Sequence, residues 1–253
     1  MRDCNLFEWL SKEKRSIIEP RMLVPKELDH AQLGIVVFLP RVYNWMKKAV
    51  HKFMFKENEG FLFRNYFITE EKLAVFHSFF GAPLTVMLVE ALIAGGINKL
   101  IIFGEAGAIS SSISSGEVLI PTFAIREEGT SYHYLPPGAT AKPSKQLQSK
   151  IKRLLAQQSV SFKEGGVWTN DAFFREPYDK VLKYSRQGVL GIDMECSAIF
   201  SVARFRKVQA ASLLLITDEL STGCWKLFFH TDDVIRKEKR VSELLVNKWY
   251  EFL

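Results

Sequence analysis

Residues 99–107 read KLIIFGEAG, an apolar run that leads into two glycines three positions apart. Four consecutive apolar side chains are typical of a strand that is buried on both faces of a sheet. The glycines allow a tight turn and a close approach of the backbone to a ligand, although an ordinary turn after a strand has the same composition. The stretch therefore predicts a central strand with a candidate binding loop at its carboxyl end.

The same kind of apolar, β-branched run recurs along the chain. Further strands are predicted at residues 33–39, 73–77, 118–125 and 210–217. Helical patterns lie between them, and they are predicted at 42–55, from Pro83 to the glycines at 95–96, and at 144–158, 177–187, 195–205 and 233–250. Strands that alternate with helices favour an α/β fold with a largely parallel sheet that is covered on both faces. One domain is predicted over residues 31–253, preceded by an N-terminal arm over residues 1–30.

Composition excludes several classes of protein. The chain has 253 residues, of which 47% are hydrophobic and 25% charged, and this balance fits a folded globular domain rather than a disordered, collagen-like or coiled-coil protein. The longest run without charged residues, 73–89, is interrupted by Gly81 and Pro83, so no membrane span is expected. No secretory signal is visible, and three distant cysteines favour a reducing compartment, so a cytoplasmic protein is predicted.

Charge and metal-binding patterns point away from other functions. The net charge of +6 is spread thinly, and its densest basic cluster, residues 236–240, contains an acid and has a helical pattern. A solvated helix face is therefore favoured over a nucleic-acid footprint. The chain has neither a C-x-x-C nor an H-E-x-x-H pattern, so no metal is expected. Walker A, G-x-G-x-x-G and G-x-S-x-G patterns are also missing.

Carboxylates follow two segments that end in the same region of the predicted sheet. Asp218 directly follows the strand at 210–217. It is either a catalytic acid or base, or an ordinary helix N-cap. Asp193 and Glu195 are two residues apart, so they point the same way if the chain is extended there. They are either a pair that grips vicinal hydroxyls or a surface acidic pair. Ligands of α/β sheets bind at the carboxyl ends of strands, so both groups are candidates for a binding site.

Taken in order, these motifs resemble the nucleoside phosphorylase superfamily. The motifs are Gly81-Ala82-Pro83, Gly104-Glu105-Ala106-Gly107-Ala108, Gly116-Glu117-Val118, Met194-Glu195 and Thr217-Asp218. That superfamily includes purine nucleoside and uridine phosphorylases and the methylthioadenosine nucleosidases. The resemblance implies a three-layer αβα fold with a mixed, mainly parallel twisted sheet and cleavage of a nucleoside N-glycosidic bond. It also implies a homo-oligomer, a dimer or hexamer, with no cofactor, and with phosphate as co-substrate if the protein is a phosphorylase.

The resemblance also implies roles by position. Glu195 matches the glutamate that holds the ribose hydroxyls, and Asp218 matches the aspartate that protonates or hydrogen-bonds a purine leaving group. Met194 and Phe80 fall at sugar-contacting positions, Asp193 at the second acid of purine enzymes, and Trp168 at an aromatic that stacks on the base. The predicted substrate-binding set is completed by Gly81, Ala106, Gly107 and Asp171.

The sequence departs from the pattern at the phosphate site. Ile102 stands where phosphorylases carry an arginine, and Ala106 stands in place of the phosphate-binding hydroxyl. Arg41, and more distantly Arg126, are the candidates left for phosphate. Glu105 replaces the serine of the nucleosidases; its side chain would repel phosphate yet orient a water, so Glu105 is the third catalytic candidate.

These features predict a nucleoside-cleaving enzyme, with hydrolysis slightly favoured over phosphorolysis. A purine substrate is favoured because pyrimidine-reading Gln and Arg have no clear counterparts after Phe174, where only Arg175 and its neighbour Glu176 follow. The alternative is a catalytically silent nucleoside-binding or sensor protein on the same fold.

Overall fold

The structure is a computed structural model that describes residues 16–24, 28, 31–50, 54–58 and 62–253. Its strands are β1 (Leu33–Val37), β2 (Met54–Asn58), β3 (Asn65–Thr69), β4 (Leu73–His77), β5 (Lys99–Ala108), β6 (Val118–Glu127), β7 (Phe162–Asn170), β8 (Val189–Asp193), β9 (Gln209–Glu219) and β10 (Lys226–Leu227). Its α-helices are α2 (Pro40–Ala49), α3 (Ala82–Ala94), α4 (Lys145–Gln157), α5 (Tyr178–Ser185), α6 (Cys196–Arg206) and α7 (Asp232–Asn247). Short 3₁₀ helices are η1 (Pro20–Leu23), η4 (Thr130–His133) and η5 (Trp249–Phe252).

The strands form one mixed sheet in the order β10-β9-β6-β7-β8-β5-β1-β4-β3-β2. The long strand β5 is parallel to β1 and to β9, and its last two residues pair antiparallel with β8. Because β5 pairs with β9 as well as with β8, the strands β5, β9, β6, β7 and β8 form a closed circuit. The carboxyl ends of β5, β8 and β9 are thereby held against one another.

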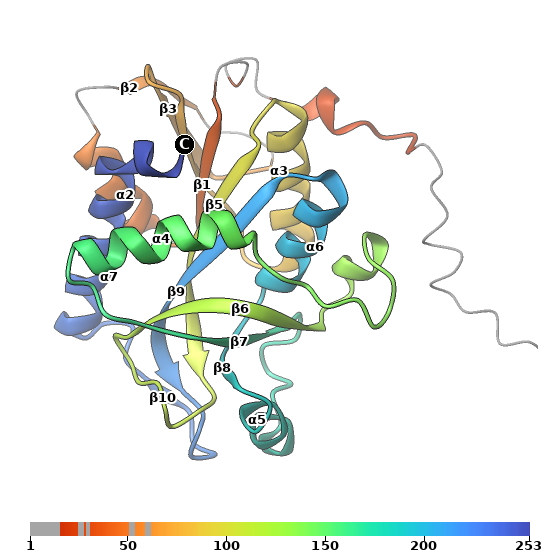
Figure 1. The fold of residues 1–253 in the computed structure, drawn as a ribbon, viewed down its shortest axis with the longest axis vertical. Helices are drawn as coiled ribbons and strands as arrows, with labels where there is room; N and C mark the ends of the chain where they lie inside the picture. The colour runs from red at the N-terminus through yellow and green to blue at the C-terminus, as the bar shows by residue number, and fades with distance from the viewer. Residues whose placement is uncertain (1–15, 25–27, 29–30, 51–53, 59–61) are drawn as a thin grey trace, which may run out of the picture.

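Helices cover both faces of this sheet, as Figure 1 shows. On one face, α2, α4 and α7 bury their apolar sides, and on the other α3 and α6 do so. The strand side chains alternate accordingly: Ile101 and Phe103 of β5 pack with the first group, whereas Leu100 and Ile102 pack with the second. Burial on both faces is the physical reason for the unbroken apolar runs in the sequence. The predicted three-layer αβα fold is confirmed.

All five predicted strands are present as β1, β4, β5, β6 and β9, and the predicted helices begin within two residues of the observed ones. Pro83 lies in the first turn of α3, as predicted, and Ser144 caps α4 by accepting a hydrogen bond from the amide of Leu147. The helix predicted to run to residue 55 was too long, because α2 ends at Ala49 and residues from Met54 form β2 against β3. Residues 51–53 lie outside the described residues, as do Cys4 and most of the predicted arm over residues 1–30.

Sequence patterns missed the strands β2, β3, β7, β8 and β10. Strand β7 contains Gly165 and Gly166, which are uncommon in strands. The fold requires them, because a Cβ on Gly166 would lie 2.4 Å from the ring of Phe123, and one on Gly165 would lie 2.4 Å from the side chain of Leu190. The candidate binding loop predicted at the carboxyl end of the central strand also begins later than expected, since β5 continues past both glycines to Ala108.

Candidate active site

A cavity of about 350 Å³ opens where β1, β5, β8 and β9 end. This is the place where parallel α/β sheets bind ligands. It is lined by Phe38, Leu39, Phe80, Glu105, Ala106, Gly107, Phe173, Glu176, Ile192, Asp193, Met194, Glu195, Thr217, Asp218 and Phe229. The cavity brings together all three predicted catalytic residues, Glu105, Glu195 and Asp218, which lie between 23 and 113 positions apart in the sequence. Its wall is apolar with a few carboxyl groups, as in most small-molecule sites.

The beginning of α6 positions Glu195. Asp193 accepts hydrogen bonds through Oδ2 from the amides of Glu195 and Cys196, at 3.2 and 2.7 Å, and through Oδ1 from the Thr169 hydroxyl at 2.6 Å. The Glu195 Oε1 atom accepts a hydrogen bond of 2.7 Å from the amide of Gly81. Gly81 has φ of +96°, a conformation that favours glycine, and it directs its amide toward the cavity wall. Asp193 therefore orients the helix start that carries Glu195.

Burial changes the protonation of Glu195. Loss of solvent around the carboxyl group, followed by the nearby negative charge of Asp193, raises the pKa of Glu195 to about 8. The amide of Gly81 acts in the opposite direction, since it stabilises the ionised form. A substrate that donates hydroxyl groups to Glu195 would favour the ionised form further, because it replaces lost water with hydrogen bonds.

A register shift places Asp218 in the cavity. Ala106 pairs with Ile216, but the next residue, Gly107, pairs with Asp218, so Thr217 is the extra residue of a bulge. Bulges re-aim side chains, and here the Asp218 carboxyl lies directly over Gly107, where an added Cβ would be 2.8 Å from Oδ2. Asp218 accepts a 2.8 Å hydrogen bond from Trp225 Nε1, and burial raises its pKa. The proposed helix-cap alternative for Asp218 is wrong, since β9 continues to Glu219 and no helix begins there.

Glu105 faces the cavity from β5. Its Oε1 atom is buried and has no hydrogen-bond partner among the described residues. Burial, and then the negative charge of Glu238, raise the pKa of Glu105 well above its ordinary value. A buried carboxyl oxygen without a partner is uncommon in folded proteins, and at a cavity wall it is a natural contact for a substrate atom.

Two predicted phosphate ligands are directed elsewhere. Arg41 makes a two-point ion pair with the fully buried Glu238 of α7, with contacts of 2.6 and 2.8 Å. Arg126 is buried and donates to the Ser131 hydroxyl and to the carbonyls of residues 135, 136 and 139. Neither guanidinium lines the cavity, so the structure does not bring the predicted phosphate ligands Arg41 and Arg126 to its wall, although the charge of Arg41 lowers the pKa of Glu105. The charged side chains that line the cavity in the described chain are all acidic.

Trp168 lies in the protein core rather than at the cavity. It is fully buried with Val181 and Tyr184, and its Nε1 donates a 3.0 Å hydrogen bond to Glu127. Because the indole is covered on all sides and is not among the residues that line the cavity, it offers no open face to a base. The prediction that Trp168 stacks on a base is therefore wrong. Phe173, which the sequence analysis did not single out, lines the cavity instead.

A change at Trp168 should therefore affect stability rather than substrate affinity. Trp168→Leu leaves a cavity in the core and removes one of the three side chains that donate hydrogen bonds to Glu127, so we expect a loss of about 2–4 kcal/mol in the free energy of unfolding. Urea unfolding measures this loss, and the KM of the folded variant should stay within about twofold of the wild type. Phe174→Leu, at an aromatic side chain that is 90% exposed, is the control and should cost less than about 1 kcal/mol. Wild-type stability in Trp168→Leu would contradict the core role.

The remaining predicted residues divide into two groups. Phe80, Ala106, Gly107, Asp193 and Met194 line the cavity. Gly81 reaches it only through the hydrogen bond to Glu195, and Asp171 is exposed and accepts a 2.9 Å hydrogen bond from the amide of Gly129. Sequence reasoning missed Phe38, Phe173 and Phe229 as aromatic wall residues and Glu176 as a fifth carboxyl group of the wall, beside Glu105, Asp193, Glu195 and Asp218. These four lie in loops or at strand ends, where no periodic pattern marks them.

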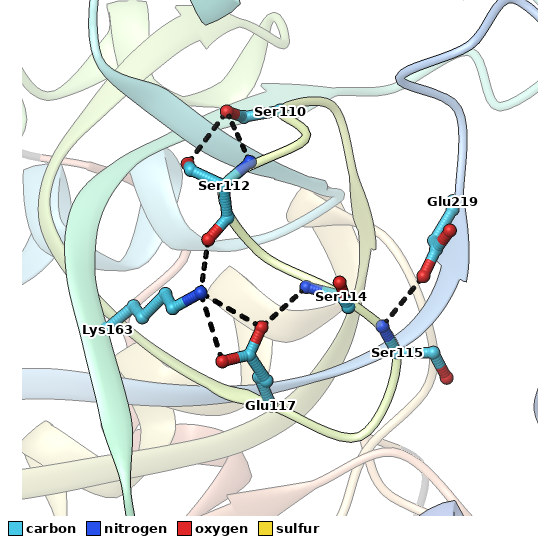
Figure 2. A network of polar contacts seen from close by, with 7 residues as sticks. All are labelled: Ser110, Ser112, Ser114, Ser115, Glu117, Lys163 and Glu219. Atoms are coloured by element: carbon cyan, nitrogen blue, oxygen red, sulfur yellow. Dashed lines mark hydrogen bonds and ion pairs between the residues drawn. The ribbon is translucent and has the colours of Figure 1, made fainter.

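The serine-rich loop after β5 is fixed by its own polar contacts, drawn in Figure 2. Lys163 of β7 contacts the Ser112 carbonyl and the Glu117 carboxylate, which accepts a 2.7 Å hydrogen bond from the Ser114 amide. The Ser115 amide donates a 2.9 Å hydrogen bond to Glu219, the residue after Asp218. Glu219 thus points to the loop while Asp218 points to the cavity. The network connects the loop after β5 and the carboxyl end of β9 to the beginnings of β6 and β7.

Other kinds of site are not seen in the described part of the chain. Within those residues, His, Cys, Asp and Glu side chains form no group of three or more that is arranged to hold a metal ion. None of the helices described there is both long and apolar enough to cross a membrane. Cys196 and Cys224, the two cysteines within the described ranges, are free.

Comparison with known proteins agrees with this architecture. A guanosine phosphorylase of Halorubrum lacusprofundi is 25% identical over 159 residues, which cover 63% of this chain and 66% of that protein. A DeoD-type purine nucleoside phosphorylase of Brevibacillus brevis is 30% identical over 147 residues, which cover 56% of this chain and 62% of that protein. The aligned region thus spans just under two thirds of the length of these relatives.

Solved structures match over nearly the whole chain. A uridine phosphorylase from Vibrio fischeri superposes with a TM-score of 0.74 at 26% identity, covering 95% of this chain and 99% of that one. A purine nucleoside phosphorylase from Toxoplasma gondii in complex with immucillin-H gives a TM-score of 0.75 at 18% identity and shows likeness of fold, over 92% and 96% of the two chains. The family model described as Phosphorylase superfamily matches residues 32–247. The chain therefore belongs to the phosphorylase superfamily, which confirms the family indicated by the glycine and carboxylate motifs.

Proposed function

We propose that the protein cleaves the N-glycosidic bond of a purine nucleoside and that water accepts the ribosyl group. One observation carries the choice of water: every charged side chain among the described residues that line the cavity is a carboxylate. Phosphate is an anion near neutral pH, and the cavity wall beside Glu105, Glu195 and Asp218 offers no cationic side chain to compensate its charge, so its binding would be unfavourable. Water carries no such penalty.

The proposed reaction uses the carboxyl groups in separate roles. Asp218 donates a proton to a ring nitrogen of the base while the bond between C1′ and the base nitrogen breaks, and the electron pair of that bond goes to the base. Glu195 holds the ribose hydroxyls and stabilises the positive charge that develops on the sugar. A water held by Glu105 adds its oxygen to C1′, and its released proton returns Asp218 to the acid form. The raised pKa of Asp218 supports its role as the acid.

A second candidate reaction is phosphorolysis, because the similar proteins from Halorubrum lacusprofundi and Brevibacillus brevis are named as phosphorylases. Purine selectivity, a homo-oligomeric state and a cytoplasmic location remain predictions from the sequence. The catalytically silent alternative also keeps the same cavity, so an activity measurement must separate three possibilities.

The test is base release from purine nucleosides in buffer with and without phosphate. We expect free ribose as the product and a rate that changes by less than about twofold when phosphate is added, since uniform binding of an unused anion does not lower the barrier. Phosphate-dependent release of ribose 1-phosphate would contradict hydrolysis, but it would still support cleavage of the N-glycosidic bond. Nucleoside binding without any turnover, with or without phosphate, would support the silent sensor.

A further inference from the structure

Glu128 is a deeply buried carboxylate outside the cavity that the proposed mechanism does not use. It directly follows β6, and only 2% of its surface is exposed. Its Oε2 atom accepts a 2.7 Å hydrogen bond from the amide of Ser131 in η4, and its Oε1 atom accepts a 2.6 Å hydrogen bond from the hydroxyl of Ser197 in α6. Glu128 therefore joins the loop between β6 and α4 to the first turn of the helix that begins after Glu195.

Arg126 fixes the loop at one end of this connection. Its guanidinium donates a 2.8 Å hydrogen bond to the hydroxyl of Ser131 and further hydrogen bonds to three carbonyl groups of the loop. It also lies 4.2 Å from the ring centre of Tyr132, whose hydroxyl donates to the Arg126 carbonyl. Burial lowers the pKa of Arg126, and the charges of Tyr132 and Glu128 oppose that shift. The loop is thus folded around a buried cation, which makes it a firm support for Glu128.

At the other end, a second hydroxyl group continues the connection to the cavity. The amide of Ser197 donates a 3.0 Å hydrogen bond to Thr169 Oγ1, and the Thr169 hydroxyl donates its only proton to Asp193 at 2.6 Å. Asp193 in turn accepts from the amides of Glu195 and Cys196. Amides at the start of a helix have no partner within the helix, and here all three from Glu195 to Ser197 are bound by side chains.

We propose that Glu128 is a positioning residue that holds the first turn of α6, and with it Glu195, in place for ribose binding. The proposal rests on the role of Glu195 in the proposed function. Ser197 is held from two sides, by Thr169 at its amide and by Glu128 at its hydroxyl. This turn cannot rotate without breaking buried hydrogen bonds, one of them to a charged group. Glu195 begins the turn and must also reach the amide of Gly81, so a small rotation displaces its carboxylate from the sugar.

Glu128→Gln tests the proposal with little change of size. A glutamine side chain has one oxygen, so either the Ser131 amide or the Ser197 hydroxyl loses its acceptor. The probes are 9-deazainosine, in which a C–C bond replaces the N-glycosidic bond, and 9-deazahypoxanthine, its base alone. Calorimetry should show about 10–100-fold weaker binding of 9-deazainosine, the range for a lost hydrogen bond to a charged group. Binding of the base alone should change by less than about twofold, because it makes no contact with Glu195.

The adjacent carboxylate provides a matched control. Glu127 accepts hydrogen bonds from Trp168, Lys180 and Tyr184 and makes none with α6. Glu127→Gln should lower the Tm, but it should change the affinity for either probe by less than about twofold.

A double variant separates positioning from a general loss of rigidity. In a protein that already carries Glu195→Gln, adding Glu128→Gln should weaken binding of 9-deazainosine by only about twofold or less, because the carboxylate that it positions is gone. A purely structural role would give the same 10–100-fold penalty in both backgrounds.

Because neither probe can be cleaved, the result does not depend on turnover. If the wild type cleaves no nucleoside, the proposed function fails, but a selective loss of 9-deazainosine binding in Glu128→Gln would still support the positioning role. Unchanged binding, or an equal loss for the base alone, would overturn it. If circular dichroism shows that Glu128→Gln is unfolded, Ser197→Ala, which removes only the hydroxyl that Glu128 holds, should give the same selective loss.

Discussion

Asp218→Asn should lower kcat/KM for a purine nucleoside by about 10²–10⁴-fold, the range typical of general acid catalysis. The asparagine can still accept the hydrogen bond that Trp225 donates, so the β9 bulge and the fold should be kept. What it cannot do is release a proton to the departing base. Steady-state rates of base release at neutral pH measure the effect.

Two comparisons separate proton donation from a structural role. Glu219→Gln changes the adjacent carboxylate, which faces Ser115 instead of the cavity, and should retain most activity. A 4-nitrophenyl riboside releases 4-nitrophenolate, a stable anion that needs no proton to depart. Asp218→Asn should therefore lose much less activity on this substrate than on a purine nucleoside. Full activity of Asp218→Asn on purines would contradict the assignment, and selective cleavage of uridine by the wild type would contradict the purine preference.

Glu195→Gln should reduce turnover by about 10–100-fold or more, because charge-assisted hydrogen bonds to the ribose hydroxyls are each worth about 1.5–3 kcal/mol. Fold and stability should not suffer, since a glutamine oxygen can still accept the hydrogen bond from the Gly81 amide. Normal turnover by this variant would contradict the sugar-binding role. A 2′-deoxynucleoside gives a further comparison, because the penalty of the substitution should shrink when a hydroxyl is missing.

The same substitution should stabilise the free protein at alkaline pH. The pKa of Glu195 is raised to about 8 in the folded state, whereas in the unfolded chain it is ordinary. The unfolded state therefore loses this proton first, and stability contributed by the protonated group is lost as pH rises from the ordinary range through about 8. Glu195→Gln removes the loss, so its Tm should exceed that of the wild type at pH 8 by about 2–4 °C for each kcal/mol gained, and by less at pH 5. An equal or lower Tm at pH 8 would contradict the buried, proton-holding state.

Local sequence was sufficient for most of the central scaffold. The apolar runs of β1, β4, β5, β6 and β9 report burial on both faces, which is a property of each segment by itself. Glycines such as Gly81 and Gly107 are required by backbone conformation or close approach, and so they mark the strand ends where ligands bind. Strand β7 was missed because it contains two glycines, which have low strand propensity. They are needed there because the side chains of Phe123 and Leu190 leave no room for a Cβ.

The composition of the candidate site depended on contacts that no local pattern contains. The sequence alone left Arg41 as a candidate phosphate ligand. In the structure it pairs instead with the buried Glu238 of α7, which lies 197 residues further along the chain. Trp168 was excluded by its full burial against Val181 and Tyr184 of α5, with its Nε1 bonded to Glu127. The sequence alone thus determined the family, the sheet core and the carboxylates at the strand ends, because these follow from periodicity and short motifs. Only the tertiary structure decided which side chains face the cavity, because a one-residue bulge at Thr217 or a distant ion pair redirects a side chain without changing the residues around it.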